Sequence, residues 1–436
     1  IIAPFLILGF YCALGGYCIK YVVLNVGNIF GAGFGNNGLG SGEVFGNMLT
    51  NQLESVIYGL IFVLLTLVIV MGGVSSGIEK FCSIGMPCLF FMLVIVIIRA
   101  CTLGGNDFAV AVLQPDGSTV EQLIHSSSLD GLKYMFQPGY VTGTGYYVPA
   151  TAEVAGQVVS AINGVPVVKF INEIPNFISI LSTAGGQMFF SLSLGMGIMI
   201  TYGSYLDKKQ NIEKNALVIV ICDTLIALMA GLAVMPARFS LDATGAIGGP
   251  KLLFITMQNV FNSMGTVGYV FGIIFYLLVI LAAVSSSISL LEVIVAHFVD
   301  KARDKGKGDK RKSYSAIAAV AAGLLCVLVC MDGLGSNGMA PFDILKIEAN
   351  GWSDCWLDCL DMVAEGILMP LGALLMSICI GYELKPQFVD EECCLEGNAF
   401  KSKTFFNICI KSITPILMVL VLLGQLDSFF SLGLFS

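Results

Sequence analysis

Residues 186–205 read Gly-Gln-Met-Phe-Phe-Ser-Leu-Ser-Leu-Gly-Met-Gly-Ile-Met-Ile-Thr-Tyr-Gly-Ser-Tyr. The stretch is apolar enough to enter a bilayer, yet two serines and two glycines lie near its centre. A helix that only anchors a chain has no need of hydroxyls and helix-weakening glycines at that depth. Two interpretations fit. The helix opens its backbone toward an ion or a small molecule, or it packs closely on its neighbours through small residues.

The composition sets the class of protein. The hydrophobic fraction is 56% and only 12% of the 436 residues are charged, about half the charge of a soluble chain. This balance indicates a polytopic membrane protein. The net charge of -8 includes no basic domain, so we expect no nucleic-acid partner. The 14 cysteines lie mostly inside apolar runs, where they act as small hydrophobes, and two histidines are too few to favour a zinc site.

Nine apolar runs are long enough to cross a hydrocarbon core of about 30 Å, which predicts an all-α polytopic membrane protein. The runs cover residues 1–26, 53–71, 81–103, 177–205, 216–239, 266–297, 314–331, 357–382 and 405–434.

Lysine and arginine predict the orientation of these spans. They gather in one set of alternate loops: Lys80; Lys208, Lys209 and Lys214; the run 301–312; and Lys385, Lys401 and Lys403. The positive-inside rule places this set in the cytoplasm. The N-terminus is then inside and the C-terminus outside, and we expect a multi-pass protein of the plasma membrane.

The outer segment 104–176 is long for a loop between spans. Turn signals lie at residues 115–117 (Pro-Asp-Gly) and 137–139 (Gln-Pro-Gly). We expect a short surface helix over residues 154–162.

Six segments in order along the chain resemble the neurotransmitter:sodium symporter family, in its bacterial sodium-dependent amino-acid transporter branch. They resemble the family's third, fifth, sixth, seventh, eighth and tenth helices. The segments are Phe10-Tyr11 with Gly15-Gly16-Tyr17; residues 72–80; residues 187–195; Asp223-Thr-Leu with Gly231 and Pro236; residues 285–290; and Asp361 ahead of Pro370.

The resemblance implies an inverted-repeat sodium-symporter (leucine-transporter-like) fold with discontinuous helices and a mid-membrane site. Its register implies an N-terminally truncated chain of nine spans that lacks the family's first two helices. We expect one transporter domain over 1–436. Residues 1–103 form the remainder of the first repeat, 104–176 an extracellular loop with an insertion over 139–173, 177–382 the second repeat, and 383–436 a cytoplasmic loop and final helix.

One candidate sodium site lies on a single helical turn. The Ala282 carbonyl and the hydroxyls of Ser285 and Ser286 can present three oxygens to one hard cation. The alternative is a small-residue packing face. The resemblance implies that this is the more widely shared of the family's two sodium sites.

Asp223 lies inside an apolar run, where a carboxylate is costly without a partner or a function. The alternative is a purely structural pairing. The resemblance places Asp223 at the other sodium site beside Ser191. Most animal members have an amide at this position and need chloride, so the carboxylate implies chloride-independent transport.

Candidate substrate residues follow from the same register; taken alone, the aromatic ones are equally consistent with packing. Tyr11 is implied to bond a substrate carboxylate and, with Phe190, to close the outer side. Ser191 and Ser193 border the helix break. Four residues are implied to line the side-chain pocket: Ile7, Met196, Ser286 and Leu290. This mostly apolar lining suits a neutral, hydrophobic amino acid.

The resemblance also implies gates. Asp361 and Asp300 correspond to the acidic halves of the outer and inner gates, with arginine partners on the absent segment, and Tyr205 joins the inner gate. Glu292, inside the sixth run, needs a partner that the sequence does not identify.

The leading hypothesis is therefore sodium-coupled symport of a neutral amino acid, with sodium co-transported and no organic cofactor. A non-transporting amino-acid sensor or inactive truncated product is one alternative, and an osmolyte or other amine transporter of the same fold is another. A membrane enzyme is disfavoured, because His125 and His297 lie apart in the chain and no nucleophile–base pair is apparent.

Overall fold

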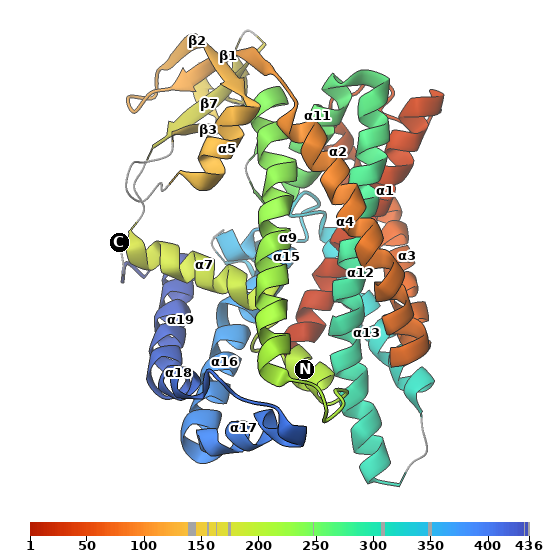
Figure 1. The fold of residues 1–436 in the computed structure, drawn as a ribbon. Helices are drawn as coiled ribbons and strands as arrows, with labels where there is room; N and C mark the ends of the chain where they lie inside the picture. Colours follow the sequence, from red (N-terminus) through yellow and green to blue (C-terminus); the bar gives the residue numbers. More distant parts are fainter. Residues whose placement is uncertain are drawn as a thin grey trace.

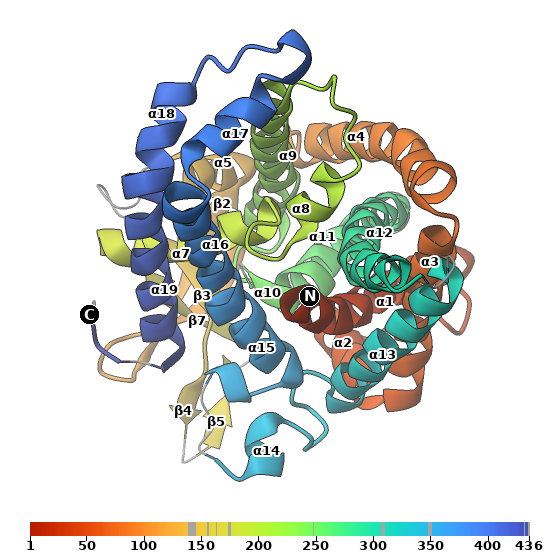
Figure 2. The same cartoon turned by 90° about the horizontal axis from the view of Figure 1, so that it is seen from below.

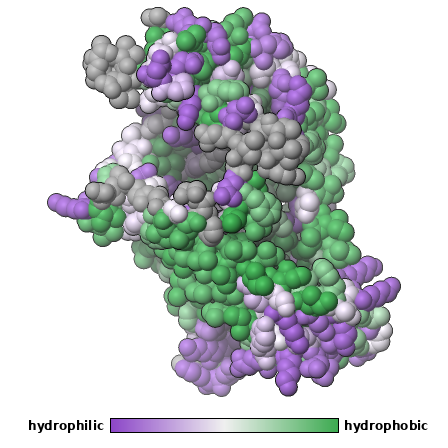
Figure 3. Space-filling model, turned by 90° about the vertical axis from the view of Figure 1, so that its left-hand side faces the viewer, coloured by the Kyte–Doolittle hydropathy of each residue, from purple (hydrophilic) through white to green (hydrophobic). Residues whose placement is uncertain are grey.

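The structure is a computed structural model that describes residues 1–137, 145–154, 157–162, 164–172, 176–246, 248–306, 310–347, 351–430 and 432–434. A body of long helices carries a small β-sheet at one end (Figure 1). On the face in Figure 3, a hydrophobic zone lies between hydrophilic surface at the top and at the bottom. This banding is typical of a protein that spans a bilayer.

Among the described residues, eight helical segments are long and apolar enough to cross a membrane. They coincide with eight of the nine predicted spans, and the ninth is the broken segment over 177–205. Six segments begin and end as α1 Ile2–Phe30, α3 Gln52–Met71, α4 Lys80–Cys101 (with a π-helical lead), α9 Ile212–Leu241, α12 Gly265–Asp304 and α13 Arg311–Asp332.

The last two spans contain π-helical turns. The first of these two spans consists of α15 Trp356–Asp361, a π-helical stretch Met362–Leu368, α16 Met369–Ile378 and a second π-helical stretch Cys379–Glu383. The second span consists of α18 Lys403–Ile408, a π-helical stretch Cys409–Ile413 and α19 Thr414–Phe430. Shorter helices connect the spans: α2 Ser41–Thr50, α10 Gly249–Lys251, α11 Met257–Ser263, α14 Pro341–Leu345 and α17 Pro386–Cys393.

Helix α1 lies inside the bundle and packs against α12, α3 and α13 (Figure 2). Small residues permit this packing: a Cβ on Gly16 would lie 2.5 Å from the backbone nitrogen of Gly59. Cys326 approaches Gly59 from α13 and is fully buried. The glycines and cysteines of these spans therefore serve close helix contacts, as small residues do in membranes.

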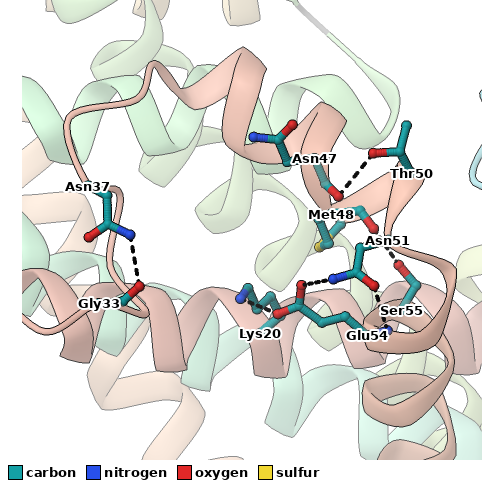
Figure 4. A network of polar contacts seen from close by, with 9 residues as sticks. All are labelled: Lys20, Gly33, Asn37, Asn47, Met48, Thr50, Asn51, Glu54 and Ser55. Carbon is teal, nitrogen blue, oxygen red and sulfur yellow. Dashed lines mark hydrogen bonds and ion pairs between the residues drawn. The ribbon is translucent and has the colours of Figure 1, made fainter.

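The one lysine inside the first span has a partner. Lys20 forms an ion pair with Glu54 at the start of α3 (Figure 4). Asn51 caps α3 by accepting a hydrogen bond from the Glu54 amide at 3.3 Å and donates to the Glu54 carboxylate at 3.2 Å. The charge pair is thus held at the α2–α3 corner, which satisfies the requirement that an intramembrane charge be compensated.

The outer segment folds into a sheet of strand order β2-β1-β7-β3, in which β1 and β7 are parallel and the other neighbours antiparallel. β6 (Ala161–Ile162) pairs with β7, and β4 (Ala152–Val154) and β5 (Gln157–Val159) form a separate hairpin. The main strands are β1 Gly105–Leu113, β2 Thr119–Ser127, β3 Tyr146–Pro149 and β7 Val165–Ile171, with helix α5 Ser128–Phe136 beside them.

The sheet was not anticipated from the sequence, and one expectation is wrong. The short surface helix predicted over 154–162 is instead strand in its described part. Val158 and Val159 are β-branched and pair with β4, which favours extended backbone. The turn at 115–117 is confirmed, with the Gln114 amide donating to the Ser118 carbonyl at 2.8 Å. Residues 138–139 of the other predicted turn, and both ends of the predicted insertion at 139 and 173, lie outside the described residues.

Arg238 at the end of α9 fastens the sheet to the membrane body. Its side chain is fully buried, and its Nη2 donates to the carbonyls of Tyr147 and Gly245, both at 2.7 Å. Helix α5 adds a second contact: a Cβ on Gly131 would lie 2.5 Å from the Met235 carbonyl of α9. The sheet is therefore an ordered cap on the helical body.

Candidate functional site

The predicted helix break is present. Helix α7 (Phe177–Ser191) ends with the Leu194 amide donating to the Phe189 carbonyl at 2.8 Å, and α8 (Ile198–Gly203) begins after six non-helical positions. Ser193, Gly195 and Gly197 have φ of 55°, 73° and 82°. Such left-handed conformations suit glycine and leave the adjoining helix ends open toward the interior.

Gly195 is also fixed by a close backbone approach. A Cβ at this position would lie 2.1 Å from the Met369 carbonyl, and a Cβ on Gly372 would lie 2.5 Å from the Gly195 carbonyl. The break in the α7–α8 segment is therefore seated directly on α16.

We expect Gly195→Ala to abolish transport or prevent folding, because the new Cβ meets backbone and the left-handed φ adds about 1–2 kcal/mol of strain. Gly203→Ala is the matched control, since a Cβ there meets nothing within 4 Å. Yield, thermal stability and uptake of the two purified variants would be compared. Equal behaviour of both would contradict the assignment of Gly195 as a required contact.

The break borders a cavity of about 530 Å³ in the middle of the helical body. This size falls within the usual range for small-molecule sites, roughly 300–1,000 Å³. The lining residues come from α1, the α7–α8 segment, α9, α12, and the start of α4 with the π-helical turn before it: Ile7, Tyr11, Ile78, Cys82, Gln187, Phe190, Ser191, Ser193, Met196, Ile198, Tyr202, Asp223, Ser285, Ser286, Ser289 and Leu290.

All eight predicted substrate residues line this one cavity, although they come from three separate parts of the chain. Sequence reasoning missed Ile78, Cys82, Gln187, Ile198, Tyr202 and Ser289. Three of these residues could have been predicted from the sequence. Ser289 is one turn after Ser285, and Ile198 and Tyr202 follow the break on the first turns of α8.

Two aromatic rings meet at one side of the cavity. The rings of Tyr11 on α1 and Phe190 on α7 lie 6.4 Å apart between centroids, tilted by 42°. Tyr11 and Ser286 of α12 both line the cavity. Tyr11 is therefore placed at the cavity, with its ring beside that of Phe190.

The serine cluster of α12 presents oxygens on one turn. Ser285 Oγ donates to the Ala282 carbonyl at 2.8 Å, and Ser286 Oγ approaches the same carbonyl at 3.4 Å. Both serines line the cavity, whereas Ala282 contributes through its backbone oxygen. Both serine hydroxyls thus lie within hydrogen-bonding distance of the Ala282 carbonyl; the role of the three oxygens as sodium ligands stays a prediction.

Asp223 of α9 faces α7. Ser191 Oγ, at the last residue of α7, lies 2.7 Å and 2.8 Å from the two carboxylate oxygens of Asp223. Both residues line the cavity. The structure therefore gives the carboxylate the partner that an intramembrane position requires, and it places a negative charge at the helix break.

One side of the cavity is crossed by two polar contacts that join α8 and the turn after it to α12. The Tyr202 and Ser289 hydroxyls lie 3.0 Å apart, and Tyr205, two residues beyond the end of α8, donates to Glu292 Oε1 at 2.7 Å. Ser289 and Glu292 are three positions apart on α12, so the two contacts lie on neighbouring turns of that helix. They join the segment that follows the break to the longest helix of the protein.

Glu292 has the partner that the sequence did not reveal. Its side chain is fully buried, and Arg311 at the start of α13 donates through Nη1 to Oε1 at 3.0 Å and forms an ion pair through Nη2 with Oε2. Arg311 Nη2 also reaches the Val70 carbonyl of α3 at 3.3 Å. In the sequence, Arg311 belongs to the basic run 301–312 and shows no sign of a buried partner. The signal available in the sequence was a glutamate inside an apolar run, followed by an arginine just before the next apolar run.

The two predicted acidic gate residues do not line the cavity. Asp300 lies two turns beyond Glu292 on α12, is exposed, and has no ion pair with any residue that the structure describes. Asp361, at the end of α15, is partly buried and lies four residues before Glu365. The gate roles of both residues therefore stay predictions, while Tyr205 has the contact just described.

An apolar helical body that encloses a polar-lined cavity at a broken helix is the architecture of membrane transporters. The sequence profile described as the sodium:neurotransmitter symporter family matches residues 176–435. This chain belongs to the sodium:neurotransmitter symporter family. It is accordingly a sodium-dependent transporter of a class that is not enzymatic, and sodium is its co-transported ion.

Individual relatives agree. The sodium-dependent transporter YhdH of Bacillus subtilis is 29% identical over 424 residues, covering 97% of this chain and 77% of the relative. A sodium-dependent transporter of Haemophilus influenzae is 25% identical over 431 residues, covering 98% and 78%. The crystal structure of MhsT in complex with L-phenylalanine superposes with a TM-score of 0.71 at 26% identity, covering 97% of this chain and 79% of MhsT. The predicted family and its inverted-repeat fold are thereby confirmed.

Proposed function

We propose that this protein moves a neutral, hydrophobic amino acid together with sodium across the plasma membrane by alternating access, without a need for chloride. The observation that carries the proposal is the cavity at the helix break, where an apolar wall meets two sets of oxygen ligands. The likeness to MhsT, whose structure holds L-phenylalanine, supports an amino acid as the substrate class.

The lining argues for an uncharged side chain. Ile7, Met196, Ile198 and Leu290 form the apolar part of the wall. Asp223 is the one charged residue among those that line the cavity, and Ser191 already donates to it. With the Asp223 carboxylate assigned to sodium, a lysine, arginine, aspartate or glutamate substrate would bury its side-chain charge without a partner, which is costly. The flexible side chain of Met196 accommodates more than one apolar shape.

Two sodium positions are proposed. One uses the Ala282 carbonyl with Ser285 and Ser286, and the other uses Ser191 with Asp223. Sodium is a hard cation that prefers such oxygens. The carboxylate of Asp223 supplies a fixed negative charge beside the second position, which removes the need for a chloride ion.

The gates are assigned to both ends of the cavity. Tyr11 bonds the substrate carboxylate, and with Phe190 it closes the outer side. Tyr205 holds the inner side through Glu292, while Asp300 and Asp361 are the acidic members of the inner and outer gates. Opening the inner side requires α8 to separate from α12, which breaks the Tyr202 and Tyr205 contacts.

The test is uptake of labelled L-phenylalanine by the full chain in proteoliposomes with an inward sodium gradient. We expect uptake that disappears when choline replaces sodium and persists when gluconate replaces chloride. Ser285→Ala should raise the sodium concentration needed for half-maximal uptake about tenfold. Ser83→Ala, at an exposed serine of α4, is the matched control. Binding of phenylalanine without any flux would overturn transport in favour of a sensor, and flux of a betaine but not of phenylalanine would favour an osmolyte carrier.

A further inference from the structure

A groove of about 470 Å³ lies on the outside of the helical body, between α3 and α4. Both helices pack on α12, whose Leu281 lines the groove from behind. Figure 2 shows α3 and α4 at the edge of the bundle, with α12 behind them. No step of the proposed transport uses this α3–α4 groove.

The wall that α4 contributes to the groove is a single face of that helix. Lys80, Ile84 and Cys88 line the groove at intervals of four residues, which places their side chains on one stripe. Ile84 is 67% exposed, and Val68 on the α3 side is 61% exposed. Because α3 and α4 cross the membrane, the medium that these apolar side chains meet outside the protein is lipid hydrocarbon.

Glycines make the groove hollow. The nearest atoms to a Cβ on Gly85 of α4 would be the Phe81 ring at 3.7 Å and Leu281 at 3.9 Å, which are ordinary van der Waals distances. The missing side chain therefore leaves the space in front of Leu281 open. At the other end of the groove, a Cβ on Gly77 would lie 2.2 Å from the Ile69 carbonyl, so the turn before α4 is pressed against the end of α3.

The α3–α4 groove carries one positive charge. Lys80, at the first residue of α4, is exposed and is the one charged residue among the described residues that line the groove. Lys80 forms no ion pair with any residue that the structure describes, and the adjacent Glu79 does not line the groove. The positive-inside rule places this end of α4 at the cytoplasmic surface, where a lysine at the end of a span reaches the level of the lipid headgroups. An apolar groove that ends in this lysine is complementary to an amphiphile with an anionic head.

The turn at the start of α4 separates the groove from the central cavity. Gly77 and Phe81 line the groove. The residues that follow each of them, Ile78 and Cys82, line the cavity at the helix break. A molecule in the groove therefore lies against the wall of that cavity from the lipid side.

We propose that the α3–α4 groove holds an anionic phospholipid of the cytoplasmic leaflet. Lys80 contacts the headgroup, and one acyl chain lies in the groove along Ile84 and Cys88, over Gly85. The inference does not rest on transport, because it uses only the position of the two spans and the charge at their cytoplasmic end.

Native mass spectrometry of the purified full chain measures the affinity, with phosphatidylglycerol and phosphatidylcholine of identical acyl chains as probes. For the first lipid bound, we expect phosphatidylglycerol to bind about fivefold more tightly, which is the effect of one lysine close to an anionic headgroup. Lys80→Gln should remove this preference. Lys208→Gln, at an exposed lysine that does not line the groove, is the matched control and should keep it.

Alkylation of the cysteines by N-ethylmaleimide, followed by peptide mass mapping, gives the location of the lipid. Cys88 and Cys222 of α9 are both exposed, but of the two only Cys88 lines the groove. Phosphatidylglycerol should slow the alkylation of Cys88 more than phosphatidylcholine does, while Cys222 reacts at the same rate in either lipid. The proposal is overturned by equal affinity for the two lipids, by an unchanged preference in Lys80→Gln, or by equal protection of Cys88 and Cys222.

Discussion

Replacing Arg311 by methionine is expected to destabilise the protein by about 3–5 kcal/mol, the usual cost of removing one partner from a buried ion pair. Glu292 is fully buried, and Tyr205 would be its one remaining hydrogen-bond partner among the described residues. Methionine preserves much of the side-chain volume of arginine, so the loss of stability measures the loss of the charge rather than a change in packing. We also expect loss of uptake, because Arg311 would no longer tie α13 to α12 beside the Tyr205 contact.

Thermal unfolding of the purified variants in detergent measures this effect, and a fall in Tm of roughly 10 °C corresponds to it. Lys312→Met, at the exposed neighbouring position, is the control. The double variant Glu292→Gln with Arg311→Met should recover most of the stability, since no charge is then left buried. If the Arg311→Met variant were as stable as Lys312→Met, the Arg311–Glu292 ion pair would not contribute this stability.

The second large effect is expected at Asp223. We expect Asp223→Asn to lower sodium-driven uptake in chloride-free medium about 100-fold, or roughly 2.7 kcal/mol, because the fixed negative charge beside the proposed sodium position is lost. The amide keeps the shape and can still accept one hydrogen bond from Ser191. The loss therefore reports charge rather than packing.

Asp207→Asn, at an exposed carboxylate just after α8, is the matched control for this experiment. Uptake would be measured with and without chloride for both variants. Addition of chloride should restore part of the uptake of Asp223→Asn and leave Asp207→Asn unchanged. Full activity of Asp223→Asn without chloride would remove Asp223 from the sodium site and from the explanation of chloride independence.

The membrane spans and the helix break were predictable because both depend on local sequence. Apolar runs define the spans by length, and Ser193 with Gly195 marks the break within a single segment. The register of a known family then assigned Tyr11 and Ser286 to one site, although they lie far apart in the chain. Composition alone would not have brought them together.

The sheet and the partner of Glu292 were not predictable in the same way. β1 and β7 alternate apolar and polar residues only weakly, and their pairing joins strands from opposite ends of the outer segment. Arg311 reads as one of many basic residues in a cytoplasmic loop. Its contact with Glu292 depends on how α13 turns back beside α12, which tertiary packing decides.

The parallel pairing of β1 with β7 has a consequence for biosynthesis. Ala111 pairs with Val167, so β1 leaves the ribosome long before its neighbour exists. At about 5–20 residues per second, the wait is roughly 3–11 seconds. During that time the β1–β2 hairpin stands alone with an open edge, and a lone hairpin is marginally stable in water. The sheet can therefore be completed only once β7 has been synthesised, shortly before the broken helix α7. Until then the unpaired edge of β1 leaves the outer segment open to proteases and to wrong strand pairing.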